Sequence, residues 1–106
     1  MEMKKSELSP KKQHLLEMTQ RIGHGRIEGL PVRDGEPILA PPPTVLRLFL
    51  FGKDNGPNAA LSSEDFVLKK NVTEMFEIFD REQSFVIDEL VIADGLPVRM
   101  TVREKA

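Results

Sequence analysis

The fold of this chain is decided by residues 15–39, LLEMTQRIGHGRIEGLPVRDGEPIL, and residues 75–99, MFEIFDREQSFVIDELVIADGLPVR, which align without a gap. The offset is 60 positions, from residue 15 to residue 75. The identical pairs are Glu17/Glu77, Arg21/Arg81, Ile27/Ile87, Leu30/Leu90, Asp34/Asp94, Gly35/Gly95 and Pro37/Pro97. Self-similarity at a fixed period is typical of a repeated structural unit.

This repetition predicts a tandem duplication inside one domain that covers residues 1–106. The first copy covers about residues 9–51, a linker about 52–62, and the second copy about 63–103. The linker is predicted because Gly, Asn, Asp and Pro are concentrated there, and these residues favour turns.

Each copy is expected to begin with a helix. In the first, Ser9 followed by Pro10 is typical of an N-cap and a first helical residue, and Gly23 is a favourable residue just after the helix end. In the second, Ser62 or Ser63 is the expected cap. The apolar residues of the second helix recur at helical spacing: Leu68, Val72, Met75, Phe76 and Phe79.

A β-hairpin is expected to follow each helix. Asp34-Gly35 and Asp94-Gly95 each lie between runs rich in Val, Ile and Leu, and Asp-Gly is favoured in type I′ turns because both central residues need a positive φ. The leading strands are predicted over about residues 26–33 and 86–93. The returning strand of copy two alternates between apolar and polar residues, which indicates one buried and one wet face.

The returning strand of copy one is less regular. Pro41-Pro42-Pro43 interrupts it, after which Thr44-Val45 repeats the pattern of Thr101-Val102. The simplest interpretation is a small insertion that forms a bulge or a polyproline step in an edge strand. Residues 45–51, VLRLFLF, are apolar at both alternating positions apart from Arg47, which predicts a strand buried on both faces.

Composition excludes several classes of function. The net charge is −2, from 15 basic and 17 acidic residues, so the chain has no overall field that would attract nucleic acid. The absence of cysteine excludes disulfides, thiol nucleophiles and thiolate metal sites. No stretch approaches the roughly 20 apolar residues of a membrane span, and no secretory signal is recognised. We therefore expect a cytoplasmic protein without a membrane partner.

The candidate chemical residues each have a structural alternative. His14 and Glu17 could face one metal from a helix, and His24 between two glycines could form a small site. Glu28 and Asp88 occupy equivalent strand positions, where two adjacent carboxylates would perturb each other's titration. The simpler alternatives are a solvated helix face, a turn residue and a solvated sheet face. No phosphate loop, nucleophile elbow or dinucleotide motif is found, so no catalytic, metal or cofactor residue is predicted.

A binding surface is the remaining candidate. It consists of residues from the apolar run and from the last strand: Val45, Arg47, Phe49, Phe51, Arg99 and Arg103. Such a surface would bind a protein, or a second copy of the chain that covers the apolar run. Arginines beside phenylalanines on an open sheet are also typical of modules that bind single-stranded RNA.

One resemblance supports the repeat. Ile22-Gly23-His24-Gly25-Arg26-Ile27 followed by Asp34-Gly35 resembles the pattern of the short bacterial YezD-like proteins, in which a helix leads through an Ile-x-Phe-Gly-x-Ile segment to an Asp-Gly turn. His24 stands where that pattern has an aromatic residue, and copy two has Phe85 one position later. The resemblance implies that the chain fuses two units that elsewhere pair as separate subunits. It assigns no functional residue.

These observations predict an α+β fold of two αββ units, with a four-stranded, mainly antiparallel sheet and two helices on one face. The alternative is a ferredoxin-like arrangement in which the order of helices and strands is circularly permuted. The expected function is a non-catalytic protein-interaction or adaptor module that forms a homodimer. The alternatives are a single-stranded nucleic-acid binder, and a metal protein or enzyme that uses His14 and His24.

Overall fold

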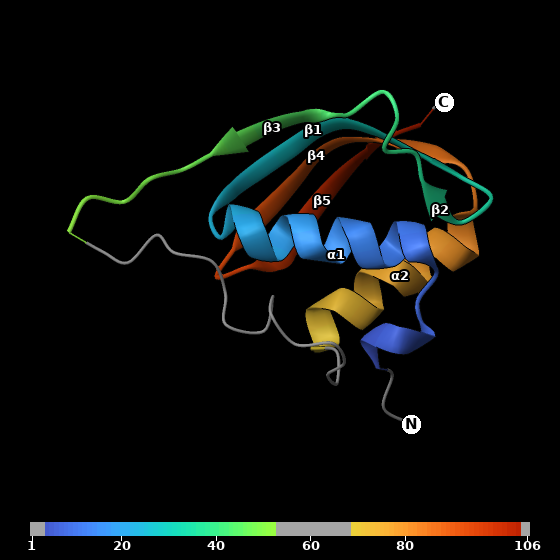
Figure 1. Cartoon of the computed structure of the whole chain (residues 1–106). Helices are drawn as coiled ribbons and strands as arrows, with labels where there is room; N and C mark the ends of the chain where they lie inside the picture. The colour runs from blue at the N-terminus through green and yellow to red at the C-terminus, as the bar shows by residue number, and fades with distance from the viewer. Residues whose placement is uncertain (1–3, 53–68, 105–106) are drawn as a thin grey trace.

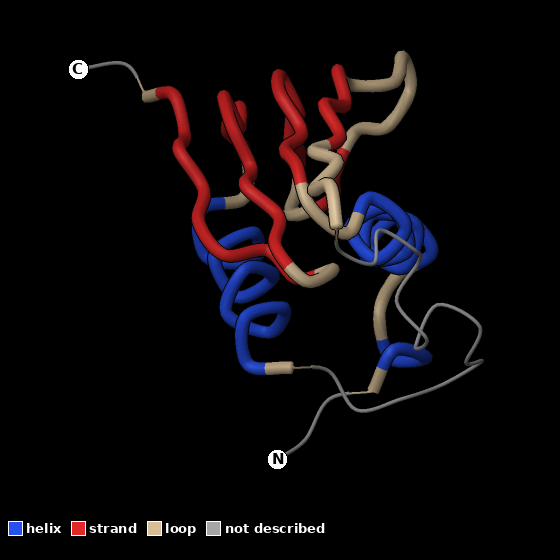
Figure 2. The backbone as a smooth tube through the Cα atoms, turned by 90° about the vertical axis from the view of Figure 1, so that its left-hand side faces the viewer, coloured by secondary structure: helices blue, strands red, loops and turns tan. Residues whose placement is uncertain are grey.

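An antiparallel sheet carries two α-helices on one of its faces in the computed structural model of the chain, which describes residues 4–52 and 69–104 (Figures 1 and 2). The fold is α+β, as predicted. In chain order the elements are η1 (Lys5–Glu7), α1 (Pro10–Ile22), β1 (Gly25–Arg33), β2 (Glu36–Pro37), β3 (Thr44–Arg47), α2 (Lys70–Glu82), β4 (Phe85–Ala93) and β5 (Leu96–Arg103). No helix within the described residues is long and apolar enough to cross a membrane.

The first helix begins and ends where the sequence indicates. The Ser9 side chain accepts a 3.2 Å hydrogen bond from the backbone N–H of Lys12, and Pro10 is the first helical residue. Gly23 follows the helix with a φ of 73°, and its N–H donates to the carbonyl oxygen of Thr19. For α2, the expected caps Ser62 and Ser63 and the apolar Leu68 lie outside the described residues. The structure places the N-cap at Lys69, without a side-chain hydrogen bond.

Both hairpins have the predicted two-residue turns. Asp34 and Gly35 have φ values of 53° and 77°, and Asp94 and Gly95 have values of 54° and 74°. These angles are those of type I′ turns. The leading strands β1 and β4 each begin one residue earlier than predicted, at Gly25 and Phe85.

The sheet has five strands, so the predicted count of four is wrong. The order is β2-β1-β4-β5, and β3 also pairs with β1, along the same edge as β2. The returning strand of copy one is therefore divided into β2 and β3, because prolines cannot donate to a ladder of hydrogen bonds. Val45 lies opposite Ile27 and Val102 lies opposite Ile87, so β3 occupies the place in copy one that the end of β5 occupies in copy two.

The two central strands pair reciprocally. Ile27 lies opposite Leu90, and Leu30 lies opposite Ile87. Ile87 and Leu90 are the residues 60 positions after Ile27 and Leu30, so exchanging β1 and β4 leaves the pairing unchanged. A local two-fold axis therefore passes between β1 and β4.

The core lies between the sheet and the two helices. Its members come from both copies and from the segment before α1: Leu8, Leu15, Leu16, Ile22, Ile27, Leu30, Val32, Val72, Met75, Phe76, Phe79, Ile87, Leu90 and Ile92. The rings of Phe76 and Phe79 meet edge to face, with centroids 5.4 Å apart. This core closes one face of the sheet.

The expectation that residues 45–51 form a strand buried on both faces is wrong for the single chain. The strand β3 ends at Arg47, and all four of its residues are exposed. The chain then continues away from the helices (Figure 1). The side chains of Leu48, Phe49 and Phe51 are 56%, 54% and 98% exposed. The run is exposed because β3 is an edge strand, with β1 as its neighbour on one side and no other described strand beside it.

Candidate interaction surface

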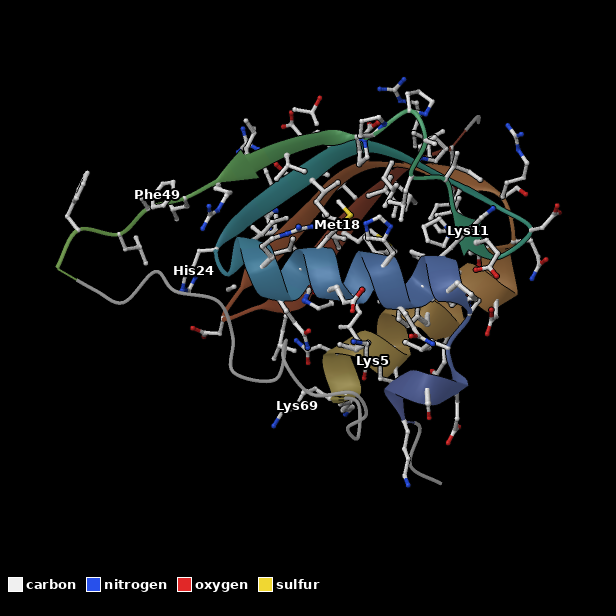
Figure 3. The ribbon with its side chains drawn as sticks, viewed as in Figure 1. Lys5, Lys11, Met18, His24, Phe49 and Lys69 are labelled. Carbon is white, nitrogen blue, oxygen red and sulfur yellow. The ribbon has the colours of Figure 1, made fainter. Side chains whose placement is uncertain are left out.

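The uncovered apolar segment is residues 45–51, which we call the apolar arm. Its exposed large side chains are Val45, Leu46, Leu48, Phe49 and Phe51. Single exposed apolar residues are common on proteins, but a contiguous group of this kind marks an interaction site. Figure 3 shows Phe49 on the part of the arm that leaves the sheet.

The backbone of the arm has a defined orientation. The N–H of Leu48 donates a 2.8 Å hydrogen bond to the carbonyl oxygen of His24, which continues the β1–β3 ladder by one step. Backbone groups alternate in direction along an antiparallel strand. The N–H and C=O groups of Leu46 and the N–H of Leu48 therefore face β1, and the backbone groups of Val45 and Arg47 face the open edge. Phe49 follows the end of β3, and its backbone groups would also face this edge if the strand were extended.

The side chains of the arm alternate between the two faces of the sheet. Val45 lies opposite the buried Ile27, so Val45, Arg47 and Phe49 project on the helix side of the sheet. Arg47 and Val45 line a groove of about 250 Å³ together with Met18, Arg21 and Ile22 of α1. Leu46 and Leu48 project on the opposite, outer side.

Arg47 is held by an aromatic ring. Its guanidinium carbon lies 4.7 Å from the centroid of Phe49, a distance at which a cation is attracted to the face of a ring. This contact orients the only charged side chain of the arm. A cation–aromatic pair therefore lies next to the open backbone groups.

The arginines of the last strand are engaged elsewhere. Arg103 forms a 2.9 Å ion pair with Asp88, and Arg99 lies 3.8 Å from a carboxylate oxygen of Glu89. Both acidic residues project on the outer face of the sheet, where Arg26 and Glu28 form another ion pair of 2.9 Å. Arg47 and Arg99 both line a hollow of about 450 Å³, together with Arg26, Leu46, Leu48 and Glu89. The predicted residues Phe49 and Arg103 do not line this hollow, and Glu89 places a carboxylate between its arginines.

The two equivalent carboxylates Glu28 and Asp88 do not form a pair with each other. Each has its own arginine, and the residue directly opposite Glu28 is Glu89. Their place on the wet face agrees with the solvated interpretation.

The histidines have structural surroundings. His14 is exposed on α1, while Glu17 forms a 2.9 Å ion pair with the buried Lys5. His24 accepts a 3.4 Å hydrogen bond at Nδ1 from the backbone N–H of Asp94. The equivalent residue Ser84 accepts one of 3.2 Å from the N–H of Asp34, so both residues support a turn. Within residues 4–52 and 69–104, no cluster of three or more His, Cys, Asp or Glu side chains could hold a metal ion.

Two residues of the surface were missed by sequence reasoning. The predicted arm residues are the odd-numbered ones: Val45, Arg47, Phe49 and Phe51. The even-numbered Leu46 and Leu48 are 40% and 56% exposed on the outer side of the sheet. The signal was present, because the run is apolar at both sets of positions. The expectation that a second copy covers this run stays a prediction.

Comparison with known proteins identifies no relative: no family model, curated protein or solved structure matches the chain.

Proposed function

We propose that this protein is a non-catalytic interaction module that binds by strand addition at the β3 edge and forms a homodimer there. The observation that carries the proposal is the apolar arm, which continues an edge strand whose backbone groups are open. Strand addition supplies backbone hydrogen bonds, and the apolar side chains contribute the hydrophobic free energy. Burial of one large side chain such as Leu48 or Phe49 contributes about 1.5–3 kcal/mol.

The opposite edge of the sheet differs in the features that prevent association. In β5, Pro97 lacks a backbone donor, and Val98 is an extra residue between the pairs Val91↔Arg99 and Ile92↔Pro97. Proline and bulges are the usual devices that protect an edge strand. From Thr44 to Phe51 the β3 edge contains neither, so we assign binding to this edge.

The proposal includes a tandem duplication. It is supported by the bounds of α1 and α2, each of 13 residues, and of β1 and β4, which all differ by 60 positions. The reciprocal pairing of Ile27 with Leu90 and of Leu30 with Ile87 also supports it. In this proposal the two copies pair as YezD-like subunits would, and copy one has acquired the arm as its binding edge.

The alternative functions have less support. Binding of nucleic acid would need several free cations beside the phenylalanines, whereas Arg99 and Arg103 lie against Glu89 and Asp88. A metal site would need a cluster of His and carboxylate side chains, and none of three or more is found within residues 4–52 and 69–104. Glu17 is paired with Lys5, and His24 lies 3.6 Å from the carboxylate of Asp94 in the turn that it supports. The apolar arm therefore remains the feature that most needs an explanation.

The test is the molar mass in solution, measured by size-exclusion chromatography with light scattering over a concentration series. We expect the wild-type chain to form a dimer. The substitution Phe49→Glu should raise the Kd of this dimer, so that it dissociates at a higher protein concentration. The matched control is Val98→Glu, because Val98 is 48% exposed on the opposite edge and Phe49 is 54% exposed. A wild-type chain that stays strictly monomeric at high micromolar concentration would refute the homodimer.

A further inference from the structure

We infer that two chains pair antiparallel about a two-fold axis at Leu48, so that Arg47 of each chain lies opposite the partner's Phe49. In the single chain β3 ends at Arg47, so the inference includes an extension of β3 through residues 48–51 when the second chain binds. This inference rests on the proposed homodimer and specifies its register. It follows from two properties of the arm: the direction of its backbone groups and the order of its side chains.

The backbone restricts the register first. Leu48 directs its N–H to His24, so in the extended strand every second residue from Leu48 faces β1. The N–H and C=O groups that face the open edge are then those of Val45, Arg47 and Phe49. In an antiparallel pair, the residues that exchange both hydrogen bonds lie directly opposite each other. Two chains that join at this edge must therefore pair these residues among themselves, so the axis passes through a residue and not between two residues. Near the centre of the arm, the possible positions are Arg47, Leu48 and Phe49.

The side chains then select the axis at Leu48. The arm reads Val45-Leu46-Arg47-Leu48-Phe49-Leu50-Phe51 and is nearly symmetric about its central leucine. An axis at Leu48 places leucine opposite leucine, valine opposite phenylalanine, and Arg47 opposite Phe49. A symmetric interface needs such a self-complementary surface. This property favours a second copy over an unrelated partner.

The other two axes are less favourable. An axis at Arg47 places the two guanidinium groups directly opposite each other, and like charges in that position destabilise a strand pair. An axis at Phe49 places Leu46 opposite Gly52 and leaves Val45 beyond the paired region. Only the axis at Leu48 pairs the whole arm.

This register explains the contact between Arg47 and Phe49. Within one chain the guanidinium lies over the ring of Phe49 at 4.7 Å. In the dimer, each Arg47 would also face the partner's Phe49 on the helix side of the joined sheet. On the outer side, Leu46 and Leu48 of both chains would form one continuous apolar row. Pro97 and the bulge at Val98 protect the outer edges, so the assembly would stop at two chains.

Cysteine cross-linking tests the register directly, because the natural chain contains no cysteine. In this register the two Leu48 residues form a non-hydrogen-bonded pair, whose Cα atoms lie about 4.5 Å apart. A disulfide accepts this separation, so the thiols of Leu48→Cys should react with each other. Leu46→Cys places the two thiols four residues apart along the strands, at about 13 Å. We expect Leu48→Cys to form a covalent dimer at least ~10-fold faster than Leu46→Cys under mild oxidation. A mixture of Leu46→Cys and Leu50→Cys chains should form the mixed dimer.

The outcomes separate this inference from the proposed function. If the reduced variants are dimeric by light scattering but Leu46→Cys cross-links with itself as fast as Leu48→Cys, the register is wrong and the homodimer remains. If the wild-type chain and the reduced variants are all monomeric, the homodimer fails, and the register fails with it. If Leu48→Cys cross-links fastest and the mixed dimer forms, both are supported.

Discussion

The backbone N–H of Gly95 donates a 2.8 Å hydrogen bond to the carbonyl oxygen of Gly23. The reciprocal bond, from the N–H of Gly35 to the carbonyl oxygen of Gln83, is also 2.8 Å long. Each hairpin turn thus satisfies a carbonyl group at the end of the helix in the other copy. Together with the pairing of β1 with β4, these bonds join the two helix–hairpin units, so neither unit has a complete set of hydrogen bonds without the other.

Removal of glycine after α1 and introduction of glycine after α2 should change stability in opposite directions. Gly23 and Gln83 are equivalent, with φ values of 73° and 66°. A residue with a side chain is strained in this conformation, and glycine is not. We expect Gly23→Ala to destabilise the protein by about 1 kcal/mol and Gln83→Gly to stabilise it by up to about 1 kcal/mol in urea unfolding. A loss of stability in Gln83→Gly would show that the side-chain bond from Gln83 to the Asp80 carbonyl is worth more than the strain.

Gly25 controls the attachment of β3. A Cβ atom at this position would lie 2.0 Å from the backbone oxygen of Leu46 and 3.0 Å from the Cα of Arg47. Backbone atoms cannot rotate away, so we expect Gly25→Ala to displace β3, to cost about 2 kcal/mol or more, and to weaken the dimer.

The matched control for Gly25→Ala is Gly29→Ala, in the same strand. Gly29 has a φ of +70°, but a Cβ there would meet nothing within 4 Å. We expect only the cost of the backbone conformation, about 1 kcal/mol, and an unchanged dimer. Equal losses in both variants would mean that the approach of β3 to Gly25 has no energetic role.

The ion pair between Lys5 and Glu17 links the segment before α1 to the helix. The Lys5 side chain is only 6% exposed, and Glu17 is 44% exposed. Loss of the carboxylate would leave a buried ammonium without this partner, although water can reach the site from the Glu17 side. We expect Glu17→Gln to destabilise the protein by about 1–2 kcal/mol in chemical denaturation. Glu77→Gln, the equivalent exposed position of α2, should change stability by less than about 0.5 kcal/mol, and similar losses in both would contradict this role.

Removal of the Arg47 guanidinium tests its contribution to assembly. A cation–aromatic contact is worth about 0.5–1 kcal/mol, and the dimer contains two of them by symmetry. We therefore expect Arg47→Ala to weaken the dimer by about 5- to 30-fold in Kd, measured by analytical ultracentrifugation. Arg103→Ala removes the same charge from the opposite edge and should leave Kd unchanged. A tighter dimer in Arg47→Ala would mean that repulsion between the two arginines dominates.

Local features of the fold were predictable from the sequence because they depend on a few neighbouring residues. Ser9-Pro10 and Gly23 set the ends of α1, and each Asp-Gly pair set a turn, because backbone angles and nearby hydrogen bonds decide these structures. The apolar spacing likewise predicted the buried face of α2, with Val72, Met75 and Phe79 in the core.

The sequence by itself determined that the chain is α+β, that helix, strand, turn and strand recur after 60 positions, and that residues 45–51 are apolar at both alternating positions apart from Arg47. Only the tertiary structure decided that the prolines divide the edge into β2 and β3, and that Arg99 and Arg103 are paired with carboxylates. It also decided that the apolar arm lies on an open edge. The physical reason is that the apolar composition of a segment indicates only that its burial is favourable. The position of the strand in the sheet determines whether its own chain can cover it.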